Sequence, residues 1–328
     1  MKKFKTYTGA LLVSVIIGAV FMVFILTTVN ILAVEDNEAS FESESIYLSQ
    51  VQPGFQPTPT ITRAEQVMKA LAEAYPRQID RVEFRRGDWA VLLRGTWYYF
   101  SEGKMLPENL LSQASSYSPH GFYNYQAELP LWRTPSEEEQ ERLRNASDLR
   151  NQRQIRRSPH FFDTLWRAGN HSEAYERVKT MRFLGQPVTV HFMIMENLSL
   201  VEETILTAAK TNSQVQAWIN SIGRIESWQW RNISDTQTRS YHAYGLALDI
   251  TPRSYGGKET YWLWTQRSRQ DWWNVSYNER HHPPAEVIKA FEKYGFIWGG
   301  KWLFFDTMHF EYRPEILILS GMPAESRR

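Results

Sequence analysis

The sequence predicts an α+β fold in which helices pack on a small antiparallel sheet, preceded by an N-terminal transmembrane helix and an α/β N-terminal region. Three observations predict it: an uncharged apolar run near the N-terminus, alternating segments with turn residues after residue 80, and short strand-like and helix-like segments between Pro187 and Tyr312. Because 42% of the 328 residues are hydrophobic and 14% are aromatic, the chain can bury a core.

Charge and cysteine content exclude several classes of function. The 37 Lys and Arg residues nearly balance the 36 Asp and Glu residues, so the net charge is +1 and we expect no nucleic-acid partner. The chain has no cysteine, which excludes disulfides, cysteine-ligated zinc, iron–sulfur clusters and thiol nucleophiles. Any bound metal must therefore be held by carboxylates or by some of the eight histidines.

Residues 1–34 are predicted to be a cytoplasmic tip followed by a transmembrane signal anchor. Three lysines near the N-terminus precede an uncharged run whose densest part, Leu11 to Val29, would as a helix approach the roughly 30 Å hydrocarbon core of a bilayer. A cleaved signal peptide ending at Ala33 is an alternative with a poor cleavage pattern, and a buried helix of a soluble domain is another.

Because lysines favour the cytoplasmic side, the rest of the chain is expected outside the membrane, with residues 9–34 in contact with lipid. Residues 35–60 are rich in Ser, Glu, Gln and Pro and predict a flexible stalk. We then expect an N-terminal extracytoplasmic region of unknown role over 61–185 and a separate domain over 186–328.

The region over 61–185 has recognisable helix and strand signals. Apolar spacing from Thr62 to Ala74 predicts a helix, and residues 81–100, with turn residues at 87–88 and 94–95, predict an antiparallel meander. The charged run from Ser136 to Arg157 predicts a solvated helix capped by Thr134 or Ser136.

The region over 186–328 begins with a predicted buried strand from Pro187 to Met195. Ser199 and Glu202 have the spacing of a capping box, and the apolar stripe behind them predicts one core-facing helix that ends at Gly223. Pro284 to Tyr294 predicts another helix, since proline opens it and glycine follows it.

Tryptophan is concentrated in the C-terminal part of the chain. Eight of the thirteen tryptophans lie between Trp228 and Trp302. We expect them to build a core, and the alternative is a groove whose walls stack on sugar or peptide.

The residues with the clearest chemical signal are His242, Asp249 and His309. On one straight strand the seven-residue spacing would put His242 and Asp249 about 23 Å apart and on opposite faces. They can share an ion only if the chain folds back, for which Gly245 is suited. Leu246 to Ile250 then reads as a strand, with a second strand at His309 beside it.

Two histidines and one aspartate would leave a zinc ion one open position for water, whose pKa zinc lowers from 15.7 toward about 7. Hydrolysis also needs a group that takes the proton of the water and returns it to the leaving amine. Asp306 is the favoured candidate and must lie in a turn or bulge. Glu311, which shares the strand face of His309, is the alternative base or a partner of that histidine.

The other histidines have no comparable companions. His281 and His282 adjoin two prolines at a helix start, and the remaining four lack suitable acidic neighbours: His120, His160, His171 and His191. The HExxH zinc helix and the GxSxG elbow of serine hydrolases are both absent.

The pattern Ser-x-His-x-x-Gly-x-Ala-x-Asp from Ser240 to Asp249, followed by Asp-x-x-His from Asp306 to His309, resembles a known peptidase family. It is similar to the zinc D,D-carboxypeptidase and L-alanyl-D-glutamate endopeptidase family, the VanY-like peptidoglycan peptidases. The run Gly295 to Trp302 also looks like the segment before the second motif of that family. The resemblance covers about 222–314 and does not extend over 35–195.

The resemblance implies one Zn²⁺ per chain, with His242, Asp249 and His309 as ligands and Asp306 as acid/base. It also implies an upstream arginine that binds the substrate and stabilises the oxyanion. Arg231 fits that role best, with Arg239 as competitor. Many members of the family carry Glu at the base position, whereas the endopeptidase-like branch often carries Asp. Ser240 is a candidate substrate-binding residue or a local turn hydroxyl.

The resemblance therefore implies an anchored zinc metallopeptidase of the bacterial cytoplasmic membrane, with its catalytic domain over 186–328 on the periplasmic or cell-wall side. The expected substrate is peptidoglycan stem peptide, cut by a D-alanyl-D-alanine carboxypeptidase activity. The alternatives are an L-alanyl-D-glutamate-type endopeptidase, a non-catalytic wall-binding or scaffold protein of the same fold, and a sensor or assembly factor in which residues 60–195 do the main work. Protein partners and oligomeric state have no sequence signal.

Overall fold

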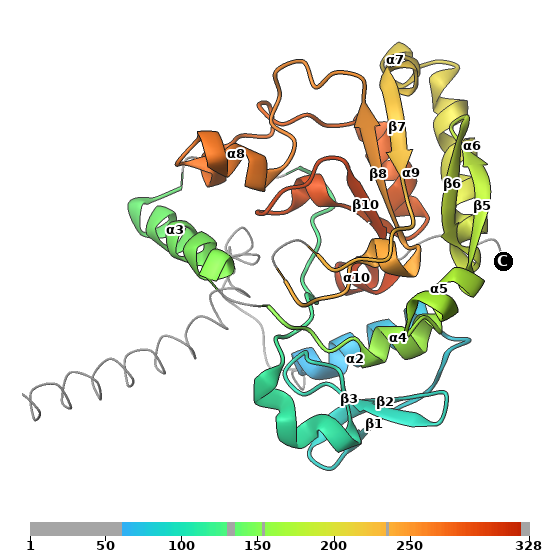
Figure 1. Cartoon of the computed structure of the whole chain (residues 1–328), viewed down its shortest axis with the longest axis vertical. Coiled ribbons are helices and arrows are strands. Elements are labelled where there is room, and N and C mark those ends of the chain that lie inside the picture. The colour runs from blue at the N-terminus through green and yellow to red at the C-terminus, as the bar shows by residue number, and fades with distance from the viewer. Residues whose placement is uncertain (1–60, 130–134, 153–154, 234–235, 323–328) are drawn as a thin grey trace, which may run out of the picture.

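The computed structural model describes residues 61–129, 135–152, 155–233 and 236–322 (Figure 1). The predicted anchor over 1–34 and stalk over 35–60 lie outside the described residues. Among the described residues, no helix has both the length and the apolar character needed to cross a bilayer. The described part mixes helices with small antiparallel sheets, as the sequence predicts.

The N-terminal part contains the predicted helix and meander. Helix α2 (Arg63–Ala74) begins where the Thr62 side chain accepts a hydrogen bond from Glu65 N at 3.2 Å. A four-stranded antiparallel sheet follows in the order β1-β2-β3-β4, with tight turns at Gly87 and Gly95, where φ is 84° and 81°. Its strands are β1 (Ile79–Arg85), β2 (Asp88–Leu93), β3 (Thr96–Tyr99) and β4 (Leu106–Pro107).

Several helices connect this sheet to the C-terminal part. The charged run forms helix α3 (Glu137–Gln152), as predicted. Ser136 caps it through a reciprocal pair: Ser136 Oγ accepts from Glu139 N at 3.3 Å and the Glu139 carboxylate accepts from Ser136 N at 2.7 Å. The other connecting elements are the 3₁₀ helix η1 (Glu108–Ser116), α4 (His160–Trp166) and α5 (His171–Arg177).

The segment that starts at residue 186 contains a helix that begins and ends at other residues than predicted. Strand β6 (Gln186–His191) pairs with β5 (Val178–Phe183) and stops at His191, because the chain then turns through η2 (Phe192–Ile194) into helix α6 (Met195–Ala209). The predicted capping box is therefore wrong. Ser199 lies inside the helix and donates to Met195 O at 3.0 Å, and Glu202 accepts from Leu184 N at 2.6 Å.

The predicted single helix is also two helices. Helix α7 (Ser213–Ser221) starts anew because the Asn212 side chain accepts from the amides of Gln214 and Val215 at 2.9 and 3.3 Å. An N-cap asparagine satisfies amides that have no partner inside a helix, so a new helix starts after Asn212. The apolar residues before and after Asn212 keep a helical spacing, which is why the sequence predicts one helix.

The C-terminal sheet is antiparallel, with the order β7-β8-β10-β9. Its strands are β7 (Ile222–Glu226), β8 (Ala247–Pro252), β9 (Phe296–Trp298) and β10 (His309–Tyr312). Helix α9 (Ala285–Lys293) begins after Pro284 as predicted, and its Phe291 ring stacks on Phe310 of β10 at 3.9 Å between centroids. Leu248 and Ile250 are buried in the same core, which leaves the opposite face of the sheet for polar side chains.

A single cluster of buried apolar side chains includes residues from both sides of the predicted boundary at 185/186. Helix α2 packs against α10 (Pro314–Leu319), where Tyr75 Oη donates to the buried Glu315 carboxylate at 2.6 Å. The domain division over 61–185 and 186–328 stays a prediction, and the hairpin β5–β6 straddles that position.

One consequence of this packing is an acid-sensitive histidine. Burial, with the charges of Arg157 and Arg313, lowers the pKa of His120 from 6.5 to about 3, so its ring stays neutral and its Nε2 donates to Ser158 O at 2.9 Å. The unfolded state takes up this proton first, so the free energy of unfolding should fall as pH drops below 6.5. We expect His120 alone to contribute a loss of about 2 kcal/mol between pH 7 and pH 5.

Urea titrations of the wild type and of His120→Gln at both pH values measure that loss. Between the two pH values, the free energy of unfolding of the variant should fall by about 2 kcal/mol less than that of the wild type, whatever the stability of the variant at pH 7. Equal pH dependence in the two proteins would show that His120 does not carry the effect.

Candidate metal centre

The local chain path that forms the candidate site depends on a 3₁₀ turn. Helix η3 (Tyr241–Tyr244) ends at Gly245, whose φ of 73° reverses the chain into β8. A Cβ at this position would lie 2.7 Å from both His191 N and Val178 Cγ1, so both the backbone angle and the close packing require glycine. His242 is thereby brought back over Asp249, as the spacing predicts.

Strand pairing supplies the third member of the cluster. His309 on β10 lies directly opposite Asp249 on β8 in the antiparallel register. His309 Nδ1 is 2.9 Å and His242 Nε2 is 3.2 Å from Asp249 Oδ1, and the two ring nitrogens are 3.3 Å apart. The structure therefore brings together the three residues that the sequence singled out, with one atom of each within 4.8 Å of the others.

The size of this triangle fits a small divalent cation. A tetrahedral zinc ion with bonds of about 2.0–2.1 Å separates its ligand atoms by roughly 3.3–3.4 Å. The three measured edges are equal to that separation or a few tenths of an ångström shorter. Two imidazole nitrogens and one carboxylate oxygen are also a donor set typical of zinc sites with an open position. His242, Asp249 and His309 could therefore hold a metal ion.

Hydrogen bonds on the far side of each ring orient the histidines. His242 Nδ1 donates to Ser227 O at 2.7 Å, and His309 Nε2 donates to the Glu311 carboxylate at 3.1 Å. The other nitrogen of each ring therefore faces Asp249, to which it hydrogen-bonds in this structure, and a bound cation would take the place of that proton. Partners of this kind fix the tautomer and the ring orientation of metal-binding histidines.

Glu311 belongs to a buried chain of charges. Arg313 Nη1 donates to Glu311 at 3.2 Å, and the Arg313 guanidinium also pairs with Glu315. Burial opposes the ionisation of Glu311, yet its hydrogen bond with His309 and the charge of Arg313 lower its pKa. Glu311 is thus held as a carboxylate that accepts from His309, the partner role that the sequence left open for it.

The electrostatics of Asp249 also favour the charged form. Its burial tends to raise the pKa, but the hydrogen bonds and charges of His242 and His309 outweigh burial and lower the pKa well below its usual range. An ionised Asp249 facing two imidazole nitrogens is the charge state that a cation requires.

Asp306 lies beside the cluster at the entrance to β10. Asp306 forms an isolated β-bridge with Tyr261, and a turn over residues 307–308 separates Asp306 from His309. The sequence predicts this position at a turn. Asp306 Oδ1 accepts from Met308 N at 3.3 Å. Burial and the charge of Asp249 raise the pKa of Asp306 to about 7, although His309 and Arg231 favour its ionised form.

The two candidate arginines have different surroundings. Arg231 Nε donates to Gln229 Oε1 at 3.0 Å, and its charge acts on Asp306, so it lies near the cluster. Arg239 instead pairs with Asp163 and donates to two backbone carbonyls, those of Ala168 and Gly169. Arg239 is therefore neither at the cluster nor a free surface residue.

Ser240 is buried and caps η3. Its Oγ accepts from His242 N at 3.3 Å, so it orients the turn that carries this histidine. The other histidines do not join the cluster: His281 contacts Tyr255, and His120 and His191 bond to backbone carbonyls.

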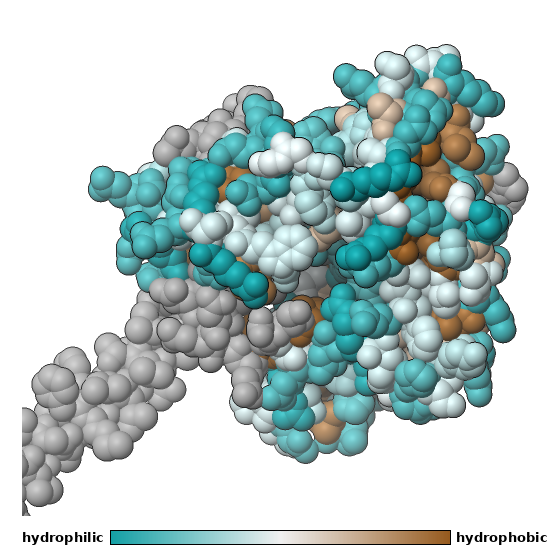
Figure 2. Space-filling model, turned by 45° about the horizontal axis from the view of Figure 1, so that its top comes forward, coloured by the Kyte–Doolittle hydropathy of each residue, from teal (hydrophilic) through white to brown (hydrophobic). Residues whose placement is uncertain are grey.

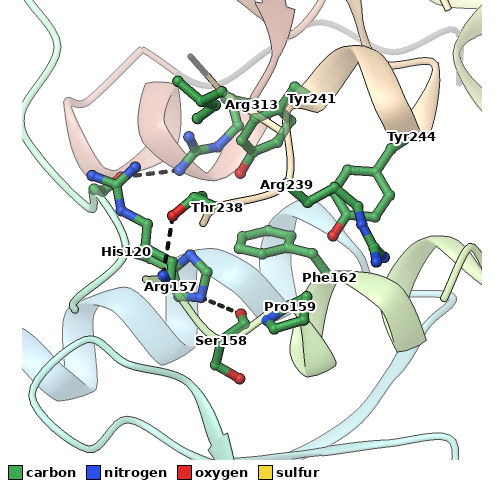
Figure 3. Close-up of a pocket in the computed structure, with 12 residues that line it drawn as sticks. His120, Arg157, Ser158, Pro159, Phe162, Thr238, Arg239, Tyr241, Tyr244 and Arg313 are labelled. Carbon is green, nitrogen blue, oxygen red and sulfur yellow. Dashed lines mark hydrogen bonds between the residues drawn. The ribbon is translucent and has the colours of Figure 1, made fainter. Parts of the chain in front are cut away.

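A small pocket lies on another side of η3 (Figure 3). Tyr241 and Tyr244 line it, whereas none of the three candidate metal ligands does. Its other labelled walls are His120, Arg157, Ser158, Pro159, Phe162, Thr238, Arg239 and Arg313. The pocket does not include the three donors, but Arg313, which lines it, also donates to Glu311, the partner of His309.

Two supporting groups were not anticipated from the sequence. Ser227 acts through its backbone carbonyl, which leaves no residue-specific signal. Arg313 does have one: Glu311 shares the strand face of His309, and Arg313 and Glu315 follow it at alternate positions just after β10.

Comparisons with known proteins agree with this geometry. Residues 234–312 match the family model of D-alanyl-D-alanine carboxypeptidase, a span that includes His242, Asp249, Asp306 and His309. Residues 67–122 match a domain of unknown function, and no curated protein and no solved structure matches the chain. The segment that carries the His–Asp–His cluster is therefore similar to the D-alanyl-D-alanine carboxypeptidase family, in agreement with the resemblance of its sequence motifs.

Proposed function

We propose that this protein is a zinc-dependent peptidase that hydrolyses peptidoglycan stem peptides, with D-alanyl-D-alanine carboxypeptidase activity. The observation that carries the proposal is the triangle formed by His242, Asp249 and His309, which has the dimensions of a zinc site and lies in a family-matched segment. An intact, correctly oriented donor set also argues against a non-catalytic wall-binding protein.

A bound zinc ion would supply a Lewis acid and a water of lowered pKa. Asp306 would accept a proton from the attacking water and return it to the leaving amine, a role suited to a carboxyl with a pKa near neutrality. Arg231 would hold the substrate carbonyl or terminal carboxylate and stabilise the oxyanion. Ser240 would act indirectly by holding η3, and its Oγ is already engaged by His242 N.

The location that we propose is the outer face of a bacterial cytoplasmic membrane. The apolar run over 9–34 would anchor the chain, the lysines would stay inside, and residues 35–60 would hold the domain toward the wall. The substrate lies on that side of the membrane, so the location and the chemistry are consistent.

Mass spectrometry of muropeptides tests the proposed reaction. The purified full chain with zinc should remove one terminal D-Ala from pentapeptide stems. A cut after L-Ala would assign the endopeptidase activity instead. Unchanged muropeptides, together with less than one zinc per chain, would favour the non-catalytic binder.

The partner of His309 provides a quantitative prediction. Glu311→Gln keeps the size of the side chain but removes the charge that orients the imidazole, so zinc affinity should fall by about 10–100-fold. Competition with a chromophoric chelator measures this change. Glu226→Gln is the matched control, since Glu226 lies opposite Asp249 on β7 but is exposed. An unchanged affinity in Glu311→Gln would contradict the orienting role.

A further inference from the structure

A group of aromatic side chains gathers at the surface beside the candidate metal centre. It consists of His171 and Tyr175 from α5 and of Trp228 and Trp230 from the segment after β7; we call these four residues the aromatic platform. The ring of His171 lies 5.4 Å from Trp228 and 6.0 Å from Trp230, and Tyr175 lies 5.8 Å from Trp228. The platform joins two segments that are far apart in the sequence.

The platform differs from the other aromatic groups in its exposure. Most of the tryptophans near the end of the chain are buried in the core, for example Trp272 and Trp298. In contrast, the Tyr175 side chain is 65% exposed, His171 is exposed, and the two platform tryptophans are only partly buried. Figure 2, which views one face only, shows the most hydrophobic residues gathered mainly toward its upper right, with smaller groups among hydrophilic residues elsewhere. Single exposed apolar residues need no explanation, but contiguous exposed rings mark binding surfaces.

Hydrogen bonds connect the platform segment to η3, the turn that carries His242. Trp228 Nε1 donates to Ala243 O at 3.0 Å, Gln229 N donates to His242 O at 3.2 Å, and Ser227 O accepts from His242 Nδ1 at 2.7 Å. Helix α5 packs against the same turn, η3. The rings are therefore held at a fixed position next to the metal cluster.

A partly buried cation contacts the platform on its inner side. The guanidinium of Arg239 lies 4.4 Å from the ring centroid of Trp230, and its ion pair with Asp163 holds it there. Two polar side chains of the same segment, Gln229 and Asn232, are exposed beside the rings and can hydrogen-bond to a ligand. Aromatic faces flanked by amides are suited to sugars, which present C–H faces and hydroxyl edges together.

We propose that the aromatic platform binds the sugars of the glycan strand to which the scissile stem peptide is attached. This inference rests on the proposed function. An extended stem of about four or five residues spans at most roughly 13–18 Å, so a sugar at its base must lie close to the metal cluster. The platform meets this requirement because Trp228 directly follows the residue that bonds to His242. The enzyme would thus select glycan-linked stems over free peptides.

Two measurements on the purified full chain test the proposal, with Tyr175→Ala and His171→Ala as variants and Phe84→Ala as control. Phe84 is similarly exposed, at 61%, but lies on β1 and contacts Trp89. The first measurement is the Kd for peptide-free glycan strands, which contain no scissile amide. Each platform variant should weaken this binding by about tenfold, as truncation of a contacting aromatic ring commonly does, and Phe84→Ala should leave it unchanged.

The second measurement compares hydrolysis of a disaccharide-linked pentapeptide with that of the free pentapeptide. Tyr175→Ala should raise KM about tenfold for the linked substrate only, at unchanged kcat, and Tyr175→Phe should restore it because stacking needs the ring and not the hydroxyl. Equal effects on both substrates, or wild-type glycan binding in both alanine variants, would overturn the proposal. If the protein binds glycan strands but hydrolyses neither substrate, the proposed peptidase activity is refuted and the glycan-binding role of the platform is not.

Discussion

Replacing Asp306 by alanine is expected to lower kcat on stem-peptide substrates by about 10²–10⁴-fold, the usual contribution of a general acid–base group. The carboxyl lies beside the cluster, where burial and the charge of Asp249 raise its pKa to about 7. In the absence of metal this carboxyl therefore exchanges a proton near neutral pH. Zinc content should stay at one per chain, because Asp306 is not among the three clustered donors. Steady-state kinetics and elemental analysis of the same preparation measure the two quantities.

Two further variants distinguish this role from the alternatives. Asp306→Asn preserves the shape and the hydrogen bond from Met308 N but cannot take a proton, so it should be as slow as the alanine variant. Glu311→Ala should lose activity mainly through weaker zinc binding, and added zinc should restore much of it. Near-normal rates in Asp306→Ala, combined with a zinc-loaded but inactive Glu311→Ala, would assign the base to Glu311.

Removal of a candidate ligand should have a different signature. Asp249→Ala and His309→Ala are each expected to weaken zinc binding by more than the roughly 10–100-fold typical of outer partners, and turnover should disappear with the metal. The reason is geometric: each substitution removes one corner of a triangle whose edges are 2.9, 3.2 and 3.3 Å. Elemental analysis after dialysis against a mild chelator reports the loss.

A histidine outside the cluster provides the control for that experiment. His282 bonds to Pro283 O and does not contact the three donors, so His282→Ala should retain one zinc per chain and wild-type turnover. Zinc retained by His309→Ala at the wild-type level would contradict the proposed ligand set. Thermal melting of the metal-free proteins shows whether a variant has lost its fold as well as its zinc, since His309 is buried and Asp249 is partly buried.

Local sequence signals were sufficient to predict the helices and strands whose ends are fixed by neighbouring residues. The apolar spacing after Thr62 forms α2, the glycines at 87 and 95 form the meander turns, and Pro284 opens α9, each as predicted. The helix after β6 was predicted incorrectly because its start depends on a turn after His191 and its break depends on the Asn212 cap. Periodicity marks which face of a helix is buried, and it does not mark where hydrogen bonding begins again.

The same division applies to the candidate site. The residue types and spacing of the two motifs identified the three donors and placed Asp306 in a turn, because strand alternation and the backbone freedom of Gly245 are local properties. The amino-acid sequence alone thus specified a His–Asp–His set suited to zinc and the strands that carry it.

Other features required the folded chain. The register that sets His309 opposite Asp249, the nitrogen that each ring presents, and the capture of Arg239 by Asp163 all join residues distant in the sequence. The aromatic platform likewise forms only when α5 packs beside η3. Such contacts arise from the packing of whole elements around a shared core, and the spacing of residues within one segment carries no information about that packing.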